Sequence, residues 1–505
     1  MKSYRAWNPG QSFLLPPSPL EWLPEGHLAY FVLELVETID LSAINGAIQE
    51  KDARGERPYP PAMLVALLLY AYAVGIFSSR KIARATYEDV AFRVLAGGAH
   101  PHFTTINEFR NTYRGEYAKV FNHVLRLCRA AGMVSLGHIA IDGTKVNANA
   151  SKHKAMSYER MQAEEQRLSA EIEELLKKAE AIDRDEDRQY GAGKMADDLP
   201  YELQLREARL KRVKEAKAAL EKEAAEARAQ QLRANAEGQR EKANDKSVDA
   251  IERKRAATRA EKAEERADEL AKRDSDDDPP NGGSGTAPEL PKHRVPVELD
   301  GTPKPNAQRN FTDPDSRIMM RNTEVTQAYN AQIAVDGESQ VIVAEGVSNQ
   351  APDAEYFEPM LDQVIENCDG DAPVVATADN GYLSKSAIDA AKRRGVNAHI
   401  AIGREDKTKK MAADGKALTP ALKARAAMAR KLSSPTGKAI YARRKAVAEP
   451  PFGQIKEARR FRRFSLRGLV KVRDEWTLVC LTHNVLKLFR SLGSLEVLAL
   501  RLATS

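Results

Sequence analysis

Residues 138–143 read His-Ile-Ala-Ile-Asp-Gly, and residues 373–381 read Pro-Val-Val-Ala-Thr-Ala-Asp-Asn-Gly. Each stretch is a short apolar run that reaches an aspartate, Asp142 or Asp379, just before a glycine or an Asn-Gly pair. A short apolar run bounded by turn residues is typical of a buried β-strand. We therefore expect both aspartates at strand ends, where the glycines permit a sharp exit of the chain.

A third acid, Glu449, lies in a basic segment that should be helical. Residues 441–473 contain eleven Lys or Arg and two acids, Glu449 and Glu457. That balance creates a local positive field that suits nucleic acid, although a solvated helical face gives the same pattern. If the three acids converge, they suit two Mg²⁺ ions, the usual device for in-line displacement at a phosphodiester. Each acid alone fits an ordinary turn or a solvated position equally well.

The spacing around Glu449 suggests which neighbours face a substrate. Tyr441 and Glu449 are separated by eight residues and share one face of a helix, with Arg444 beside it. If the helix continues through Pro450-Pro451, Lys456 extends that face, whereas a kink at the prolines would end it. On this basis Lys456 would touch a phosphate and Tyr441 would stack on a base or ribose.

The second half of the chain alternates short strands with helices. Asp336-Gly337 separates two β-rich runs and signals a hairpin. Further along we expect a helix at 354–367, a strand at 373–378, a helix at 384–394, a strand at 398–402 and an amphipathic helix at 476–490. With the strand at 138–141, these form an α/β core interrupted by a large helical insertion. Asp313 and Asp315 are either a rival metal pair or an Asp-Pro turn.

The insertion spans residues 156–298. Residues 157–271 are dominated by Ala, Glu, Lys, Arg, Leu and Gln, and apolar residues recur every seven positions from Met161 to Ile182. This pattern predicts a helical hairpin or coiled coil, broken at Gly191 and Gly193, with a second helix over 200–270 that would be roughly 100 Å long if unbroken. Residues 274–296 have the composition of a linker. The insertion is either a dimerisation or DNA-guiding arm, or a solvated spacer.

Residues 1–135 are expected to be helical. Pro60-Pro61 suit the start of a helix, a turn near Gly75 leads into a second helix over 80–95, and Thr105 to Glu108 has the capping-box pattern of a third. This order favours either a DNA-binding helix-turn-helix or a plain helical bundle. The apolar run 61–77 is shorter than the roughly 20 residues of a membrane span. The three cysteines lack metal-ligand spacing, and the N-terminus lacks a signal-peptide pattern, so we expect a cytoplasmic protein.

At these residues the chain resembles the DDE transposases of bacterial insertion sequences. The resemblance is carried by IAIDGTKVNANASK, TQAYNAQIAVD, VVATADNGYLS and YARRKAVAEPPFGQIKEARRFRRFSLRG. The last segment is similar to the family's Tyr/Arg/Glu/Lys signature, here Tyr441, Arg444, Glu449 and Lys456, with a gap between Arg and Glu that is one residue longer than usual. The resemblance implies an RNase H-like mixed sheet with flanking helices, an all-α N-terminal domain and a long coiled-coil insertion.

The resemblance also implies domains and a mechanism. The domains are a DNA-binding domain at 1–135, a catalytic domain at 136–155 and 299–470, the insertion, and a C-terminal helical segment at 471–505. The catalytic and metal-binding residues are Asp142, Asp379 and Glu449, which use two Mg²⁺ or Mn²⁺ ions for cleavage and strand transfer at element ends. The expected DNA contacts are Tyr441, Arg444, Lys456, Lys145, Arg459, Arg460, Arg462 and Arg463. Action on two ends suggests at least a dimer; the alternatives are a DNA-binding protein with an inactive catalytic domain, or a metal-dependent nuclease.

Overall fold

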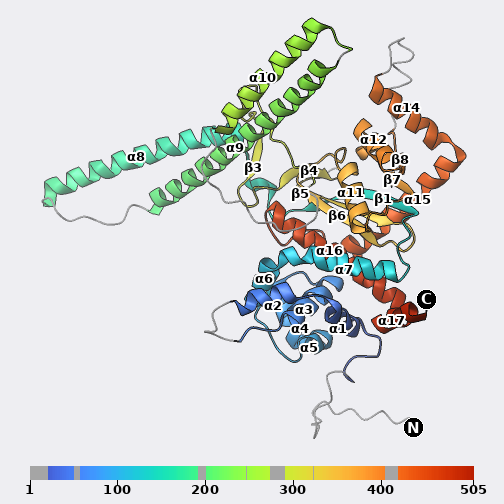
Figure 1. The fold of residues 1–505 in the computed structure, drawn as a ribbon. Helices are drawn as coiled ribbons and strands as arrows, with labels where there is room; N and C mark the ends of the chain where they lie inside the picture. The colour runs from blue at the N-terminus through green and yellow to red at the C-terminus, as the bar shows by residue number, and fades with distance from the viewer. Residues whose placement is uncertain are drawn as a thin grey trace, which may run out of the picture.

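The computed structural model of the protein describes residues 21–50, 57–190, 201–245, 247–272, 290–321, 324–403 and 419–504. Within these residues the chain is a mixed α/β protein, as predicted. A helical N-terminal part packs beneath a mixed sheet, and a long helical arm projects from the opposite side (Figure 1).

The sheet has the strand order β4-β5-β1-β7-β8, and β6 also pairs with β5. β1 is antiparallel to β5 and parallel to β7, and β7 is parallel to β8. The predicted hairpin at Asp336-Gly337 joins β5 to β6 and is confirmed. The strands are β1 His138–Asn147, β4 Arg317–Arg321, β5 Glu324–Asp336, β6 Ile342–Ser348, β7 Val375–Ala378 and β8 Asn397–Ile400.

Helices from the second half of the chain cover the sheet. α11 packs on β5 and β6, α15 packs on β1, and α16 packs on β6 and also on the N-terminal helices α3 and α7. The helices expected at 354–367 and 384–394 are confirmed, and α16 begins earlier than residue 476. The bounds are α11 Phe357–Asn367, α12 Lys385–Arg393, α14 Pro420–Ser433, α15 Pro435–Gly453, the π-helix η5 Gln454–Ala458, α16 Leu469–Leu492 and α17 Leu495–Thr504.

The N-terminal part is a compact set of helices around the apolar helix α3, whose residues from Leu64 onward are buried. The single helix expected over 80–95 is wrong, because the Asp89 carboxylate accepts from the backbone N–H groups of Ala91 and Phe92 and starts a new helix there. The expected capping box is also wrong, since α6 begins at Phe103. The bounds are α1 Leu28–Thr38, α2 Ser42–Gln49, α3 Pro61–Ala73, α4 Ser79–Glu88, α5 Val90–Leu95, α6 Phe103–Thr112, η2 Arg114–Glu116 and α7 Tyr117–Ala130. Among the described residues, no helix combines the length and apolarity needed to cross a membrane.

The arm consists of α8 Tyr158–Tyr190, α9 Tyr201–Asn244 and α10 Ala250–Lys272. α9 packs on both neighbours, and α10 folds back along it, so the single helix expected over 200–270 is wrong. At the base, β2 Ala155–Ser157 pairs antiparallel with β3 Gln308–Asn310, and η3 Lys152–Lys154 precedes this pair. The breaks predicted at Gly191 and Gly193, and most of the predicted linker, lie outside the described residues.

Candidate active site

Strand register brings Asp142 and Asp379 together. The parallel pairing of β1 with β7 runs from His138↔Val375 to Ile141↔Ala378, and each aspartate is the residue that follows the last pair. Only Asp379 follows a strand end, because β1 continues to Asn147 along β5, where Asp142 pairs with Ile333. The expectation that both acids end strands is therefore corrected for Asp142, although the two residues do lie side by side.

Asp142 is held by a cation. Its Oδ2 atom accepts from Nη1 of Arg444 at 3.0 Å, and the two side chains are 16% and 12% exposed. Burial raises the pKa of Asp142, Arg444 opposes that shift, and the neighbouring Asp379 adds to it. The Asp379 carboxylate accepts from the Gly381 N–H at 2.8 Å, which fixes the turn after β7. Two adjacent carboxylates beside one guanidinium form the centre of the site.

Glu449 lies on α15, the helix that packs against β1 and that also carries Arg444. Its side chain is exposed. In the part of the chain that the structure describes, no three His, Cys, Asp or Glu side chains are grouped so as to hold a metal ion. The structure therefore brings together two of the three predicted acids, Asp142 and Asp379. Glu449 lies on the adjacent helix α15 with its side chain toward solvent.

α15 continues through Pro450-Pro451 to Gly453, so the kink that would have ended the predicted face does not occur there. Proline has no N–H for the carbonyl four residues earlier. The carbonyl of Ala446 instead accepts from Nε2 of Gln340 at 3.0 Å. A side chain from the β5–β6 hairpin thus replaces the missing helical hydrogen bond.

Lys456, in η5, also reaches β1. Its Nζ donates to Oγ1 of Thr144 and to the carbonyl of Lys145, the latter at 3.3 Å. Burial lowers the pKa of Lys456 to about 8, with further lowering by Arg321 and Arg462. On the preceding helix, the guanidinium of Arg444 lies 5.9 Å from the ring centre of Tyr441. Tyr441, Arg444 and Lys456 therefore line the α15 side of the two aspartates.

Two of the predicted DNA contacts need correction. Arg459 is 4% exposed and donates to the carbonyl of Val479 at 3.0 Å and to Oγ1 of Thr482 at 2.8 Å, so it lies inside the protein. Lys145 is 17% exposed and donates to the carbonyl of Ala351 at 2.7 Å, with Asp353 at 3.4 Å. Because Arg459 and Lys145 both donate to groups inside the protein, both have a structural role in this conformation.

Arg460, Arg462 and Arg463 remain at the surface. The aromatic residues that alternate with them, Phe461 and Phe464, are each 1% exposed and anchor the loop in the core. Arg462 forms an ion pair with Glu457. Buried aromatic residues thus hold a loop that presents arginines outward next to the site.

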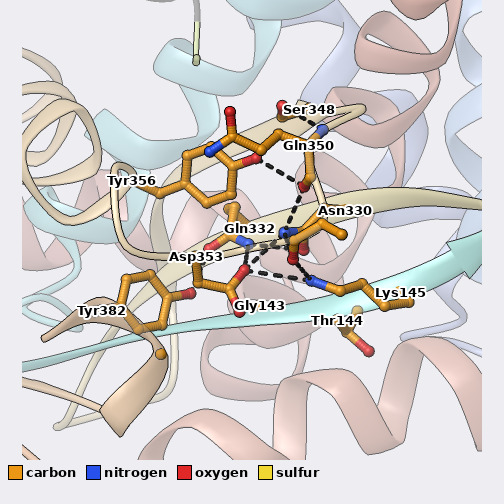
Figure 2. Close-up of polar contacts among 12 residues, drawn as sticks. Gly143, Thr144, Lys145, Asn330, Gln332, Ser348, Gln350, Asp353, Tyr356 and Tyr382 are labelled. Carbon is orange, nitrogen blue, oxygen red and sulfur yellow. Dashed lines mark hydrogen bonds and ion pairs between the residues drawn. The ribbon is translucent and has the colours of Figure 1, made fainter. Parts of the chain in front are cut away.

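A buried polar network that was not predicted from the sequence lies on the other side of β1 (Figure 2). Oδ1 of Asp353 accepts from Nδ2 of Asn330 at 2.6 Å and from Nε2 of Gln332 at 3.0 Å, and Lys145 lies beside it. The hydroxyl of Tyr382 donates to Oε1 of Gln332. The available signal was two amides, at alternate positions within the mostly apolar run 328–335, that point to the same face.

Asp313 and Asp315, the rival metal pair, stabilise the start of α16 instead. Oδ1 of Asp313 accepts from the Gly468 N–H at 3.0 Å and from the Tyr329 hydroxyl at 2.8 Å. Asp315 accepts from the Leu469 N–H at 2.8 Å. Both therefore act as structural turn and cap residues.

Comparison with known families agrees with this geometry. Residues 296–485 match the family described as the transposase DDE domain, and residues 18–112 match a transposase domain designated DUF772. Neither the curated proteins nor the solved structures gave a match. The first match runs from β3 into α16 and includes Asp379 and Glu449, whereas the second covers α1 to α6.

Proposed function

Because the chain belongs to the DDE-type transposases of insertion sequences, we propose that it cleaves DNA at the ends of its element and transfers the freed strands to a target. The observation that carries this proposal is the register that sets Asp142 beside Asp379 on adjacent parallel strands. The strand order, with three antiparallel strands followed by two parallel ones across β6-β5-β1-β7-β8, supports an RNase H-like catalytic domain.

The donor chemistry of the site fits a divalent cation. Asp142 and Asp379 offer adjacent carboxylate oxygens, the ligands that Mg²⁺ and Mn²⁺ favour. Glu449 is the third candidate ligand, on the helix layer that covers β1. Two bound ions would supply activation of the attacking water or 3′-hydroxyl and stabilisation of the leaving oxygen.

The surrounding cations have separate roles in this proposal. Arg444 favours the ionised form of Asp142 against burial, which keeps an oxygen ligand available. Lys456 presents its ammonium group next to β1, where it would bind a phosphate oxygen near the acids. Tyr441 would stack on a base or ribose, and Arg460, Arg462 and Arg463 would hold the backbone outside the site.

The test uses duplex DNA that carries the short inverted repeats flanking the gene. Asp142→Asn, Asp379→Asn and Glu449→Gln should each abolish Mg²⁺-dependent cleavage, by at least about a hundredfold, while duplex binding persists. Glu457→Gln is the matched control, because Glu457 is an exposed acid on the same segment whose ion pair is with Arg462. Retained cleavage in one of the first three variants would remove that residue from the site.

The products separate the alternatives. A joined donor–target molecule identifies strand transfer, whereas cut ends alone identify a nuclease. Binding of the repeats without nicking in Mg²⁺ or Mn²⁺ identifies a DNA-binding protein with an inactive centre. Because transposition acts on two ends, we also propose at least a dimer on DNA, which light scattering of the protein–repeat complex would test.

A further inference from the structure

The hairpin of α9 and α10 has two unlike sides. The helices meet along a seam of small residues, and the buried set is Ala229, Leu232, Ala236, Ala260, Ala263, Ala267 and Leu270. Figure 1 shows this hairpin projecting away from the sheet, with only its base near the rest of the protein. Beyond that base, the charged residues described on its outer surface therefore do not pack against the sheet.

On one side of the seam, the charges of the two helices neutralise each other. Arg240 pairs with Glu264 at 2.5 Å, and Arg233 pairs with Asp268 at 3.1 Å. These contacts also show that the two helices are antiparallel. The acids of α10 on this side are therefore matched by arginines of α9.

The other side is cationic. Arg255, Arg259 and Lys262 follow each other at intervals of four and three residues, which places them in one row on α10, and all three are exposed. In the part of the chain that the structure describes, none of the three forms an ion pair, unlike Arg233 and Arg240. On α9, Asn235, Gln239 and Lys242 follow each other at the same intervals of four and three residues, and this row carries no acid.

Such a row opposes helix stability unless something neutralises it. Like charges at spacings of three or four residues repel, whereas opposite charges at those spacings attract. The neighbouring helix α8 uses the attractive arrangement, with Arg167–Glu171 and Glu173–Lys177 pairs. In α10, by contrast, Arg259 has only the cations Arg255 and Lys262 as charged neighbours at these spacings, and the acids Glu252 and Glu265 stand at the two ends of the row.

We propose that this side of the hairpin, with Arg255, Arg259 and Lys262 at its centre, binds the sugar–phosphate backbone of duplex DNA. The inference rests on the proposed function, because it assigns the insertion a place in the transposase–DNA complex. The contacts are to phosphates and carry no sequence preference.

The test measures the affinity of the full chain for a duplex of unrelated sequence over a range of salt concentrations. The variant Arg255→Ala, Arg259→Ala, Lys262→Ala loses three phosphate contacts. The negative slope of log K against log salt should therefore become less steep by about three. The control Lys211→Ala, Arg212→Ala, Lys214→Ala removes the same charge from exposed positions elsewhere on α9 and should change the slope by less than one. Arg255→Lys with Arg259→Lys keeps the charges and should retain the parent slope.

Helix content and melting temperature establish that each variant folds, since all six positions are exposed and alanine favours helix. An unchanged slope in the Arg255/Arg259/Lys262 variant, or an equal change of slope in the control, would overturn the inference. Neither result would bear on the proposed cleavage of the element ends. A parent chain that binds no duplex would overturn both the inference and the proposed function.

Discussion

A Cβ atom at residue 143 would lie 2.2 Å from Nε2 of Gln332, the amide that the Tyr382 hydroxyl and Asp353 hold across β1. From the sequence alone, Gly143 is expected to permit a strand exit. The structure gives a different reason for glycine: it leaves room for a buried amide directly beside Asp142. Through Tyr382, that amide also holds the turn that carries Asp379.

We predict that Gly143→Ala destabilises the protein by about 1–3 kcal/mol, because the new methyl group must displace Gln332 from a packed network. Urea unfolding measures the loss. Gly238→Ala is the control: Gly238 lies inside α9 with nothing within 4 Å of its Cβ position, and alanine there should stabilise the helix by up to about 1 kcal/mol. Equal stability of the Gly143 variant and the parent would show that Gln332 is not confined by this glycine.

Some contacts of single residues could be predicted from the sequence, and others could not. The adjacency of Asp142 and Asp379 was predictable, because both follow apolar strand patterns. The partners of Asp353 were not, because its hydrogen bonds to Asn330 and Gln332 depend on how β6 pairs with β5 and on how the chain continues after β6. Burial of Arg459 was equally hidden, since a run of arginines gives no local sign of which one turns inward.

At the scale of single elements, α15 and η5 form a continuous helical layer that brings its cations to β1. Arg444 reaches Asp142, and Lys456 reaches Thr144. At Pro450, the carbonyl of Ala446 is satisfied by Gln340, a long-range contact that no local rule predicts. The fold-back between α9 and α10 was missed although a local signal was present: residues 244–249 read Asn-Asp-Lys-Ser-Val-Asp, and the Asp249 carboxylate accepts from the Ile251 N–H at the start of α10.

Lys456 makes this element sensitive to pH. Its folded-state pKa of about 8 means that its ammonium group loses its proton as the pH rises through that value. We predict that affinity for duplex DNA falls over this range. Lys456→Arg, which stays protonated, should remove this step while binding persists. Fluorescence anisotropy at constant ionic strength measures both curves, and a parallel decline in the arginine variant would assign the pH dependence to another group.

At the scale of the molecule, α16 joins the N-terminal helices to the sheet. Its Glu475 is 1% exposed; Oε2 accepts from the Ser465 and Leu466 N–H groups, and Oε1 accepts from the hydroxyl of Tyr72 on α3. Arg110 donates to the same hydroxyl at 3.1 Å. The two parts are thus connected through a buried polar contact as well as apolar packing. Such long-range pairing cannot be derived from the helical pattern of either part.

We predict that Glu475→Ala lowers the free energy of unfolding by about 3 kcal/mol, because it strands two buried N–H donors and removes the charge that balances Arg110. Glu475→Gln should cost less, since it keeps an acceptor. Glu457→Ala, at an exposed ion pair, should change stability by less than about 1 kcal/mol. Limited proteolysis during unfolding adds a second readout: early release of an N-terminal fragment in Glu475→Ala would show that this contact couples the two parts.

The β2–β3 pair at the base of the arm has a consequence for biosynthesis. The central strand β1 is made long before β5 and β7, its partners in the sheet, so the nascent apolar strand must wait for them. A loop of this length is costly to close if it is unstructured. The arm, however, can assemble from local contacts first, and the Tyr158 N–H then donates to the carbonyl of Ala307 at 2.8 Å. The chain segments on either side of the insertion would then already lie next to each other. β5 and β7, which are synthesised later, would therefore pair with β1 after closing a shorter loop.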